Sequence, residues 1–137
     1  MANIELQKGQ TLSNQQVCDL FKCSLYGGMN RSRKTNTLVL VSNYTRDLYE
    51  DRWDDDKIFH YTGMGQTGDQ SLDYAQNKTL YESNVNGVEV HLFEVYKSGE
   101  YIYQGIVNLA KDPYSERQLD KDKNDRSVWV FPLSLLE

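Results

Sequence analysis

The sequence predicts an α+β fold, in which a rolled, mostly antiparallel β-sheet or small barrel carries flanking helices. Three observations support this prediction. The 137 residues are 39% hydrophobic and 26% charged, which suits one globular domain with its own core. Several short apolar segments alternate with a period of two, as strands do. Two others carry apolar residues at helical spacing. We therefore expect residues 1–137 to form a single domain.

The first helix is expected at about residues 11–23. Ser13 and Gln16 have the spacing of a capping box, and Val17, Leu20 and Phe21 form one apolar stripe. A barrel is expected to follow at about residues 27–135. Residues 26–34 favour a flexible basic loop, residues 37–41 a buried β-branched strand, and the acidic residues 44–57 an exposed connection.

The second half of the chain predicts the remaining strands. Residues 58–62 resume strand character and run into the glycine-rich segment 63–68. Asp69 is expected to cap a helix whose stripe reaches Leu80. Residues 88–95 and 101–107 alternate around a turn, which predicts a hairpin. Residues 112–126 favour a charged loop, and residues 127–133 favour the last strand.

The charge of the chain constrains its partners. A net charge of −5 argues against nonspecific binding to nucleic acid, because phosphates attract positive charge. Residues 1–34 nevertheless carry five basic and two acidic groups, so a local basic face remains open. No apolar run approaches the roughly 18 residues needed to cross a bilayer, and no signal peptide is visible. We therefore expect a soluble, cytoplasmic protein without membrane contact.

The sequence offers little for catalysis. Neither Cys18 nor Cys23 has a histidine nearby in sequence, and there is no Gly-x-Ser-x-Gly elbow. The segment 63–68 lacks the Lys-Ser/Thr ending of a Walker loop. The acidic run at 49–56 has no spacing that would arrange calcium or magnesium ligands. We expect a binding module with no catalytic residues, no cofactor and no metal.

Aromatic residues favour a ligand with flat faces. The chain has ten tyrosines and two tryptophans, and Tyr44, Tyr49, Trp53 and Tyr61 fall at junctions between loops and strands. Half-buried tyrosines are common in sheets. Next to a carboxylate and backbone amides, they also suit an extruded nucleobase.

Seven segments occur in a specific order along the chain. They are Leu38-Val-Leu-Val, Tyr49-Glu-Asp-Arg-Trp, Phe59-His-Tyr-Thr-Gly-Met-Gly, Asp69-Gln-Ser-Leu with Asn77-Lys-Thr-Leu, Tyr103-Gln-Gly and Val128-Trp-Val-Phe-Pro-Leu. Together they resemble the SRA (SET- and RING-associated, or YDG) domain, a PUA-like barrel that reads methylated cytosine in DNA. The likeness covers most of residues 27–135, although the family has Tyr-Asp-Gly where this chain has Tyr103-Gln-Gly. The N-terminal helix and basic loop resemble a bacterial branch found with HNH-type nucleases in modification-dependent restriction.

The resemblance implies that a modified cytosine is flipped out of the duplex into an aromatic pocket. Tyr61 would stack on one face of the base, and Thr62 would contact its edge or hold the pocket wall. Backbone groups of residues 41–43, which include Ser42 and Asn43, would contact the base edge. Trp53 is expected at the same pocket.

Two positions in this pocket stay open, because the chain has extra residues between the matched segments. The second stacking tyrosine is Tyr49 when counted back from Tyr61 and Tyr44 when counted forward from residues 38–41. The aspartate that reads the base is Asp47 when counted forward, whereas counting back lands on Arg52 beside Asp51. An arginine cannot accept a hydrogen bond from the cytosine amine. Either Asp47 or Asp51 therefore reads the base, or the preferred base is not plain 5-methylcytosine.

The resemblance also implies contacts to the DNA backbone. Arg31, Arg33 and Lys34 would hold phosphates, with Lys78 a weaker candidate. Asn77 and the turn beginning at Gln66 occupy the place where the family inserts a loop to fill the vacated space.

We therefore expect the chain to bind double-stranded DNA carrying 5-methylcytosine or 5-hydroxymethylcytosine, as the specificity module of an HNH-type restriction endonuclease whose nuclease is not in this chain. The alternative is a PUA-like barrel that binds RNA or a small ligand without base flipping, which the net charge and Arg52 favour. A hydrolase that uses the acidic loop is the third reading. The sequence does not define the modification, the flanking preference or the oligomeric state.

Overall fold

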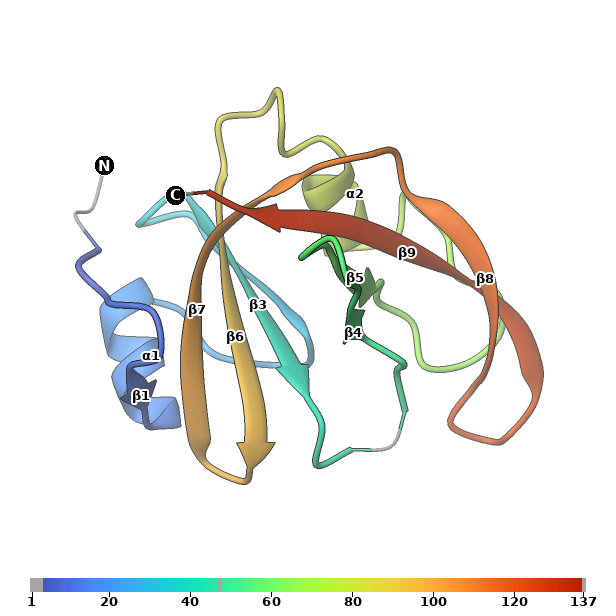
Figure 1. Cartoon of the computed structure of the whole chain (residues 1–137), viewed down its shortest axis with the longest axis horizontal. Helices are drawn as coiled ribbons and strands as arrows, with labels where there is room; N and C mark the ends of the chain where they lie inside the picture. Colours follow the sequence, from blue (N-terminus) through green and yellow to red (C-terminus); the bar gives the residue numbers. More distant parts are fainter. Residues whose placement is uncertain (1–3, 47, 137) are drawn as a thin grey trace.

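The computed structural model describes residues 4–46 and 48–136. Within them, nine strands and two helices follow one another along the chain (Figure 1). The helices are α1 (Asn14–Phe21) and α2 (Gln76–Tyr81). The strands are β1 (Thr11–Leu12), β2 (Met29–Ser32), β3 (Thr37–Asn43), β4 (Arg52–Trp53), β5 (Phe59–Thr62), β6 (Glu89–Lys97), β7 (Glu100–Leu109), β8 (Tyr114–Leu119) and β9 (Asp125–Leu135).

The strands form one sheet in the order β2-β3-β6-β7-β9-β5-β4, with β1 added to β7 and β8 added to β9. The β3–β6 pairing is parallel, and the other pairings of the described strands are antiparallel. Strands β3 and β5 are separated by three strands in this order, yet the Tyr61 side chain on β5 reaches the backbone of β3. The sheet therefore rolls up, and a seam forms where β5 returns to β3.

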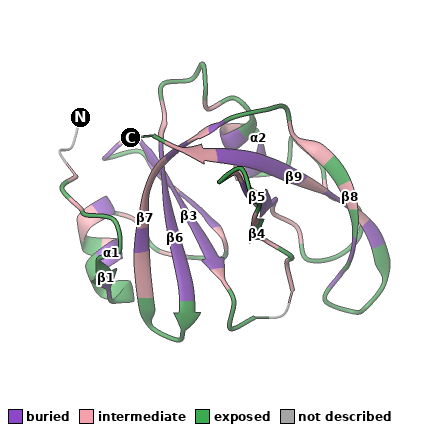
Figure 2. Ribbon diagram, in the orientation of Figure 1, coloured by how far each residue is buried: buried purple, intermediate pink, exposed green. Residues whose placement is uncertain are grey.

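Alternate residues of β3 explain where the core lies. Leu38 and Leu40 belong to the interior cluster of the roll, which also contains Phe59, Phe131 and Leu133. Val39 and Val41 point to the other face, where Val17 and Phe21 of α1 cover them. The buried stretches of the central strands in Figure 2 follow from these two packed faces.

The structure confirms the predicted fold class and several elements. Helix α1 has the capping box expected from its sequence, with Ser13 Oγ accepting from the Gln16 amide and the Gln16 side chain accepting from the Ser13 amide. The strand predicted at 37–41 and the hairpin around residues 97–100 are also present. No helix in the described part of the chain has the length and apolarity to cross a bilayer.

Residues 11–12, predicted as the start of the first helix, form β1 on β7, and α1 begins only at Asn14. Three further predicted segments were wrong. Residues 29–32 are not loop but strand β2, because they pair with β3. Residues 114–119 form β8 on β9 instead of belonging to a charged loop. Residues 52–53 pair with β5 as β4 within the predicted exposed connection. These three strands are short and mostly polar, so their pairing depends on a neighbour and not on an apolar pattern of their own.

The second helix is shorter than predicted. It begins at Gln76, and Ala75, not Asp69, is the residue before it. The Asp69 carboxylate instead accepts a hydrogen bond from the Ser127 amide at 2.8 Å. The chain before α2 is thus bound to β9 and cannot continue the helix toward Asp69.

Candidate nucleic-acid interface

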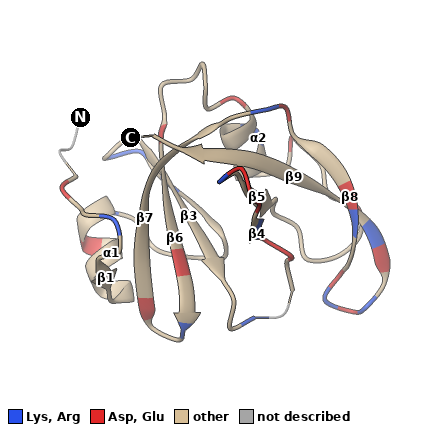
Figure 3. Cartoon of the chain, in the orientation of Figure 1, with Lys and Arg blue, Asp and Glu red and all other residues tan. Residues whose placement is uncertain are grey.

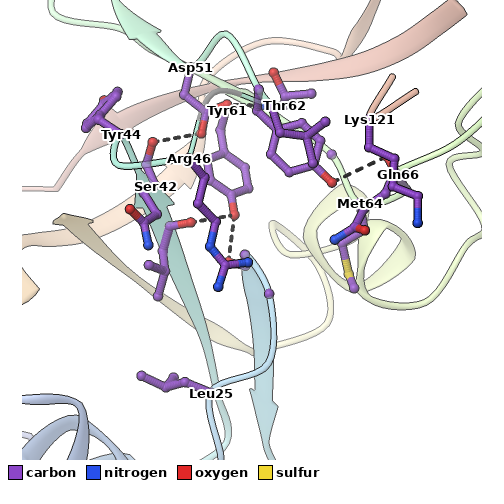
Figure 4. A pocket seen from close by; sticks show the side chains of 18 of the residues that line it. Leu25, Ser42, Tyr44, Arg46, Asp51, Tyr61, Thr62, Met64, Gln66 and Lys121 are labelled. Atoms are coloured by element: carbon purple, nitrogen blue, oxygen red, sulfur yellow. Dashed lines mark hydrogen bonds between the residues drawn. The ribbon is translucent and has the colours of Figure 1, made fainter. Parts of the chain in front are cut away.

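A pocket of about 460 Å³ opens at the seam between β3 and β5. Its lining comes from the ends of these two strands, from the β3–β4 loop (residues 44–51), from the glycine-rich loop after β5 (residues 63–68) and from Gly27–Gly28. Figure 4 shows the labelled side chains converging from these segments. A pocket of this size suits a ligand of a few rings.

Tyr61 closes the seam at the base of the pocket. Its hydroxyl donates to the carbonyl oxygens of Gly28 at 2.6 Å and Val41 at 3.3 Å, so β5 is tied to β3 and to the turn before β2 (Figure 4). The residue is only 2% exposed, and its burial raises the pKa of the phenol well above its usual value. A side chain at Gly28 would collide with this hydroxyl. The predicted stacking tyrosine therefore lines the pocket and also holds it together.

Asp51 bridges the same seam a little further along. One carboxylate oxygen accepts from Ser42 Oγ on β3 at 2.7 Å, and the other accepts from the Thr62 amide on β5 at 2.7 Å. Loss of water around the carboxyl group raises its pKa to about 6, although these hydrogen bonds oppose the shift. Its neighbour Arg52 points away and pairs with Glu116 at 2.6 Å. Asp51 and Arg52 are the two residues that the count back from Tyr61 left as candidates, and only Asp51 lines the pocket.

Both candidate stacking tyrosines line the pocket, but they are held differently. Tyr49 is half-buried, its hydroxyl donates to the Gly65 carbonyl oxygen at 3.3 Å, and burial raises its pKa. Tyr44 is stacked on Tyr96, with ring centroids 4.8 Å apart and ring planes 16° apart. Its hydroxyl donates to Glu94 at 2.6 Å, and burial raises its pKa as well. One face of Tyr44 is therefore already covered by another ring.

Three further residues were predicted at the pocket, namely Asn43, Asp47 and Trp53. Trp53 does not line the pocket, contrary to the prediction. Pairing of β4 with β5 directs its indole onto Phe59, with ring centroids 4.8 Å apart, and its Nε1 donates to Glu94 at 3.3 Å. Asp47 lies outside the described residues. Asn43 does line the pocket.

The glycine-rich loop is braced by Asn77, which is fully buried. Its Oδ1 accepts from the Met64 amide at 2.6 Å, and its Nδ2 donates to the carbonyl oxygens of Met64 at 3.1 Å and Ser71 at 3.0 Å. The predicted role of Asn77 as a group that fills the DNA stack does not fit this burial. The residue instead sets the backbone shape of the pocket wall.

Two further braces were not predicted. Gln70 donates to the carbonyl oxygens of Gly63 at 2.7 Å and Gly65 at 3.1 Å, while its own oxygen accepts from the Trp129 amide. Arg126 is 1% exposed, and its Nη1 donates to the Gly65 and Gly68 carbonyl oxygens. Among the described residues, Nε and Nη2 of Arg126 have no hydrogen-bond partner. The motif residue Gln70 could have suggested a brace, whereas nothing in the sequence marks Arg126.

The predicted phosphate contacts lie away from the pocket. Arg31 donates to the Thr37 carbonyl oxygen at 3.1 Å and to Asn36 Oδ1 at 3.0 Å, so it stabilises its own turn. Arg33 and Lys34 are exposed in that turn, which precedes the start of β3, whereas the pocket is lined by the other end of β3. Lys78 is exposed on α2 and does not line the pocket. Gln66 does line it.

Several lining residues escaped the sequence-based prediction because they come from loops far apart in the chain. They are Leu25, Arg46, Leu48, Met64, Tyr74, Tyr101 and Lys121. Both histidines and both cysteines lie outside the lining. The part of the chain that the structure describes contains no cluster of three or more metal-binding side chains.

Comparison with known proteins places this geometry in a family. Residues 8–137 match the family described as ScoMcrA-like, SRA domain. No curated protein sequence is a significant match. A structure of the sulfur binding domain and SRA domain of ScoMcrA complexed with phosphorothioated DNA superimposes with a TM-score of 0.78 at 17% identity. The match covers 96% of this chain and 40% of that one.

Two other solved structures share the fold. The SRA domain of SUVH5 in complex with hemi-methylated CG DNA has a TM-score of 0.70 at 18% identity, and the match covers 99% of this chain and 93% of that one. The DNA modification-dependent restriction endonuclease AspBHI has a TM-score of 0.65 at 17% identity, over 88% of this chain and 37% of that one. This chain thus spans less than half of the ScoMcrA and AspBHI chains.

Proposed function

Because this chain belongs to the ScoMcrA-like SRA domain family, whose domains are DNA-binding modules, we propose that it binds double-stranded DNA by taking a modified cytosine into the seam pocket. The observation that carries this proposal is the bridge made by Asp51. Its carboxylate lines the same pocket as Tyr49 and Tyr61, two of the five tyrosines in the lining.

Stacking on the aromatic side chains of the pocket can offset the cost of extruding a base. Extrusion costs a few kcal/mol of pairing and stacking, and a base stacked on an aromatic ring recovers about 1–3 kcal/mol. Tyr61 is held rigidly by two hydrogen bonds, so its ring is positioned before the base arrives. We assign the second ring to Tyr49 and not Tyr44, since Tyr96 already covers one face of Tyr44.

The edge of the base would meet Asp51 and the residues beside it. The cytosine edge presents an amine donor, which an ionised carboxylate accepts. The amide of Thr62 and the hydroxyl of Ser42 already hold that carboxylate in place. Asp51 therefore becomes the reading residue in this proposal, and Arg52, paired with Glu116, has no part in it.

The identity of the mark is a separate question. ScoMcrA was solved with phosphorothioated DNA and the SUVH5 domain with methylated DNA, so relatives of the same fold meet different modifications. We take 5-methylcytosine or 5-hydroxymethylcytosine as the proposed mark and an HNH-type restriction endonuclease as the proposed setting.

The test is binding of one short duplex by fluorescence anisotropy at a stated salt concentration. Unmodified, 5-methylcytosine, 5-hydroxymethylcytosine and phosphorothioated versions are compared. A preference of tenfold or more for one cytosine modification, about 1.4 kcal/mol, supports the proposal. A preference for the phosphorothioated duplex alone would move recognition to the backbone. Equal, weak binding to all four, with tighter binding to single-stranded RNA, would favour the PUA-like alternative.

A further inference from the structure

The basic and acidic side chains that line the pocket lie at different depths. Arg46 and Lys121 are the basic residues among its described lining, and both are exposed. Asp51 is the acidic residue among the same lining, and it is turned inward onto Ser42 and Thr62. The lining is thus positive at its exposed rim and negative where β3 and β5 meet, although the chain carries a net charge of −5. Figure 3 shows that basic and acidic residues are both distributed over the rest of the fold.

Arg46 belongs to the β3–β4 loop. Its amide donates to the Asn43 carbonyl oxygen at 3.3 Å, in the turn that directly follows β3. Figure 4 shows its side chain extending from this loop toward the pocket, beside Tyr61 and Ser42. The exposed guanidinium of Arg46 can therefore contact a ligand group at the opening of the pocket while β3 and β5 stay in place.

Lys121 belongs to the turn between β8 and β9, which rests on the glycine-rich loop. Its amide donates to the Gln66 carbonyl oxygen at 3.0 Å. The turn is shaped by Asp120, whose carboxylate accepts from the amides of Asp122 and Asn124 at 2.9 Å each and from the Gly68 amide at 3.4 Å. Of the two acidic residues next to Lys121, Asp120 is engaged with backbone amides and Asp122 is exposed, and the lysine lines the second wall of the pocket.

This layout matches one kind of ligand. A cytosine nucleotide within a DNA strand presents an amine at its base edge and a phosphate on each side of its sugar. An inner carboxylate suits the amine, and two cations at the rim suit the phosphates. A free base would leave both cations without a partner. The predicted phosphate contacts at residues 31–34 lie at the far end of β3 and cannot serve the same nucleotide.

We propose that Arg46 and Lys121, one on each wall of the pocket, bind the two backbone phosphates that flank the extruded nucleotide. The proposal rests on the function proposed above and adds the residues that hold the strand while the base is in the pocket. Each contact neutralises one phosphate, so each should contribute about 0.9 to the slope of log affinity against log salt. At 0.1 M salt this corresponds to about eightfold in affinity for each residue.

The experiment combines Arg46→Ala, Lys121→Ala and the double variant with three duplexes that carry the preferred modification. One duplex has ordinary phosphates, and the others have a neutral methylphosphonate on the 5′ or the 3′ side of the modified cytosine. On the ordinary duplex each single variant should lose about eightfold in affinity at 0.1 M salt and about threefold at 0.3 M salt. On one of the neutral duplexes, a different one for each variant, that loss should disappear.

Lys34→Ala is the matched control, because Lys34 is equally exposed but lies at the far end of β3. It should bind all three duplexes as the unsubstituted chain does. Wild-type affinity in Arg46→Ala and Lys121→Ala, or a loss that is the same on all three duplexes, overturns the phosphate assignment and leaves the proposed function intact. If the unsubstituted chain shows no preference for any modified duplex, the proposed function fails, and this assignment fails with it.

Discussion

The glycine-rich loop (residues 63–68) and the β3–β4 loop (residues 44–51) both line the pocket, but they are built in different ways. Buried or half-buried side chains outside the glycine-rich loop hold its backbone, through Gln70, Asn77 and Arg126. The β3–β4 loop is held chiefly by its own side chains, through Tyr44 on Glu94 and Asp51 on Ser42 and Thr62. The first loop is therefore a preformed wall, and the second carries three of the groups that we assign to the ligand, Arg46, Tyr49 and Asp51.

This difference separates stability from recognition. Removing a brace from the glycine-rich loop leaves partly buried backbone groups without partners, which costs folding free energy. Removing the Tyr49 side chain from the β3–β4 loop should cost less folding free energy, because its one hydrogen bond, to the Gly65 carbonyl oxygen, is 3.3 Å long. Substitutions in the two loops should consequently be distinguishable by measuring unfolding and binding side by side.

The largest effect is expected from Asn77→Ala. It removes three hydrogen bonds and leaves the partly buried amide and carbonyl of Met64 unpaired, so the free energy of unfolding should fall by about 3 kcal/mol. Urea denaturation followed by circular dichroism measures this change. The neighbouring exposed residue gives the control Lys78→Ala, which should stay within about 0.5 kcal/mol of the unsubstituted chain. An equally small change in Asn77→Ala would refute the account of the braced wall.

Tyr49→Ala should weaken binding to the modified duplex by about 10- to 100-fold, because one stacking face of the base is lost. The free energy of unfolding should change less than in Asn77→Ala. Tyr49→Phe keeps the ring and loses only the 3.3 Å hydrogen bond to Gly65, so its affinity should remain within about threefold. If Tyr44→Ala loses binding and Tyr49→Ala does not, the second ring belongs to Tyr44.

The affinity for the modified duplex should depend on the protonation state of Asp51. With a pKa near 6, its carboxyl group is mostly ionised at pH 7.5 and accepts from the cytosine amine, whereas protonation at pH 5.5 removes this acceptor. Affinity for the modified duplex should therefore fall as the pH is lowered through 6, and Asp51→Asn should bind weakly with little change over this range. A wild-type profile that is flat from pH 5.5 to 7.5 would argue against Asp51 as the reading group.

Stability should respond to pH in the opposite direction. The pKa of Asp51 is higher in the folded state than in the unfolded state, so the folded protein binds more protons between about pH 4 and 6. The contribution of Asp51 to the free energy of unfolding is then greatest below this range and is lost as the pH rises through it. Thermal unfolding of the unsubstituted chain and Asp51→Asn at pH 4.5 and 7.5 isolates this contribution.

The smallest effect is expected at the turn between β2 and β3. Arg33→Ala should change the affinity for modified DNA by less than about twofold, since this turn lies at the end of β3 opposite the pocket. Anisotropy titration at low salt, where weak electrostatic contacts are strongest, is the most demanding check. A loss of affinity comparable to that of Arg46→Ala would support the phosphate contact that the sequence predicted at Arg33.

The sequence alone was sufficient for the fold class and the apolar strands, because period-two alternation in segments such as 37–41 follows directly from burial. It did not predict β2 or β8, whose residues are mostly polar and become strands through β3 and β9. It also left Asp47 and Asp51 as alternatives. Only the contacts with Ser42 and Thr62 place Asp51 in the pocket.

The basic residues show more clearly what the sequence alone could not predict. Arg31, Arg33 and Lys34 stand together in sequence and therefore suggested a phosphate contact. Arg46 and Lys121 are far apart in sequence, and they become neighbours of one pocket because β5 returns to β3 and the β8–β9 turn rests on Gln66. Pattern along the chain cannot reveal a cluster that only the rolled sheet assembles.

The central claim is that the modified cytosine leaves the helix and enters the seam pocket. The most direct test compares affinity for two duplexes that differ only opposite the modified cytosine, where one has guanine and the other an abasic site. Loss of the pairing partner lowers the cost of extrusion, so the abasic duplex should bind at least tenfold more tightly, and Tyr49→Ala should lose affinity for both duplexes. Equal affinity for the two duplexes would show that the base stays in the helix and would contradict the account.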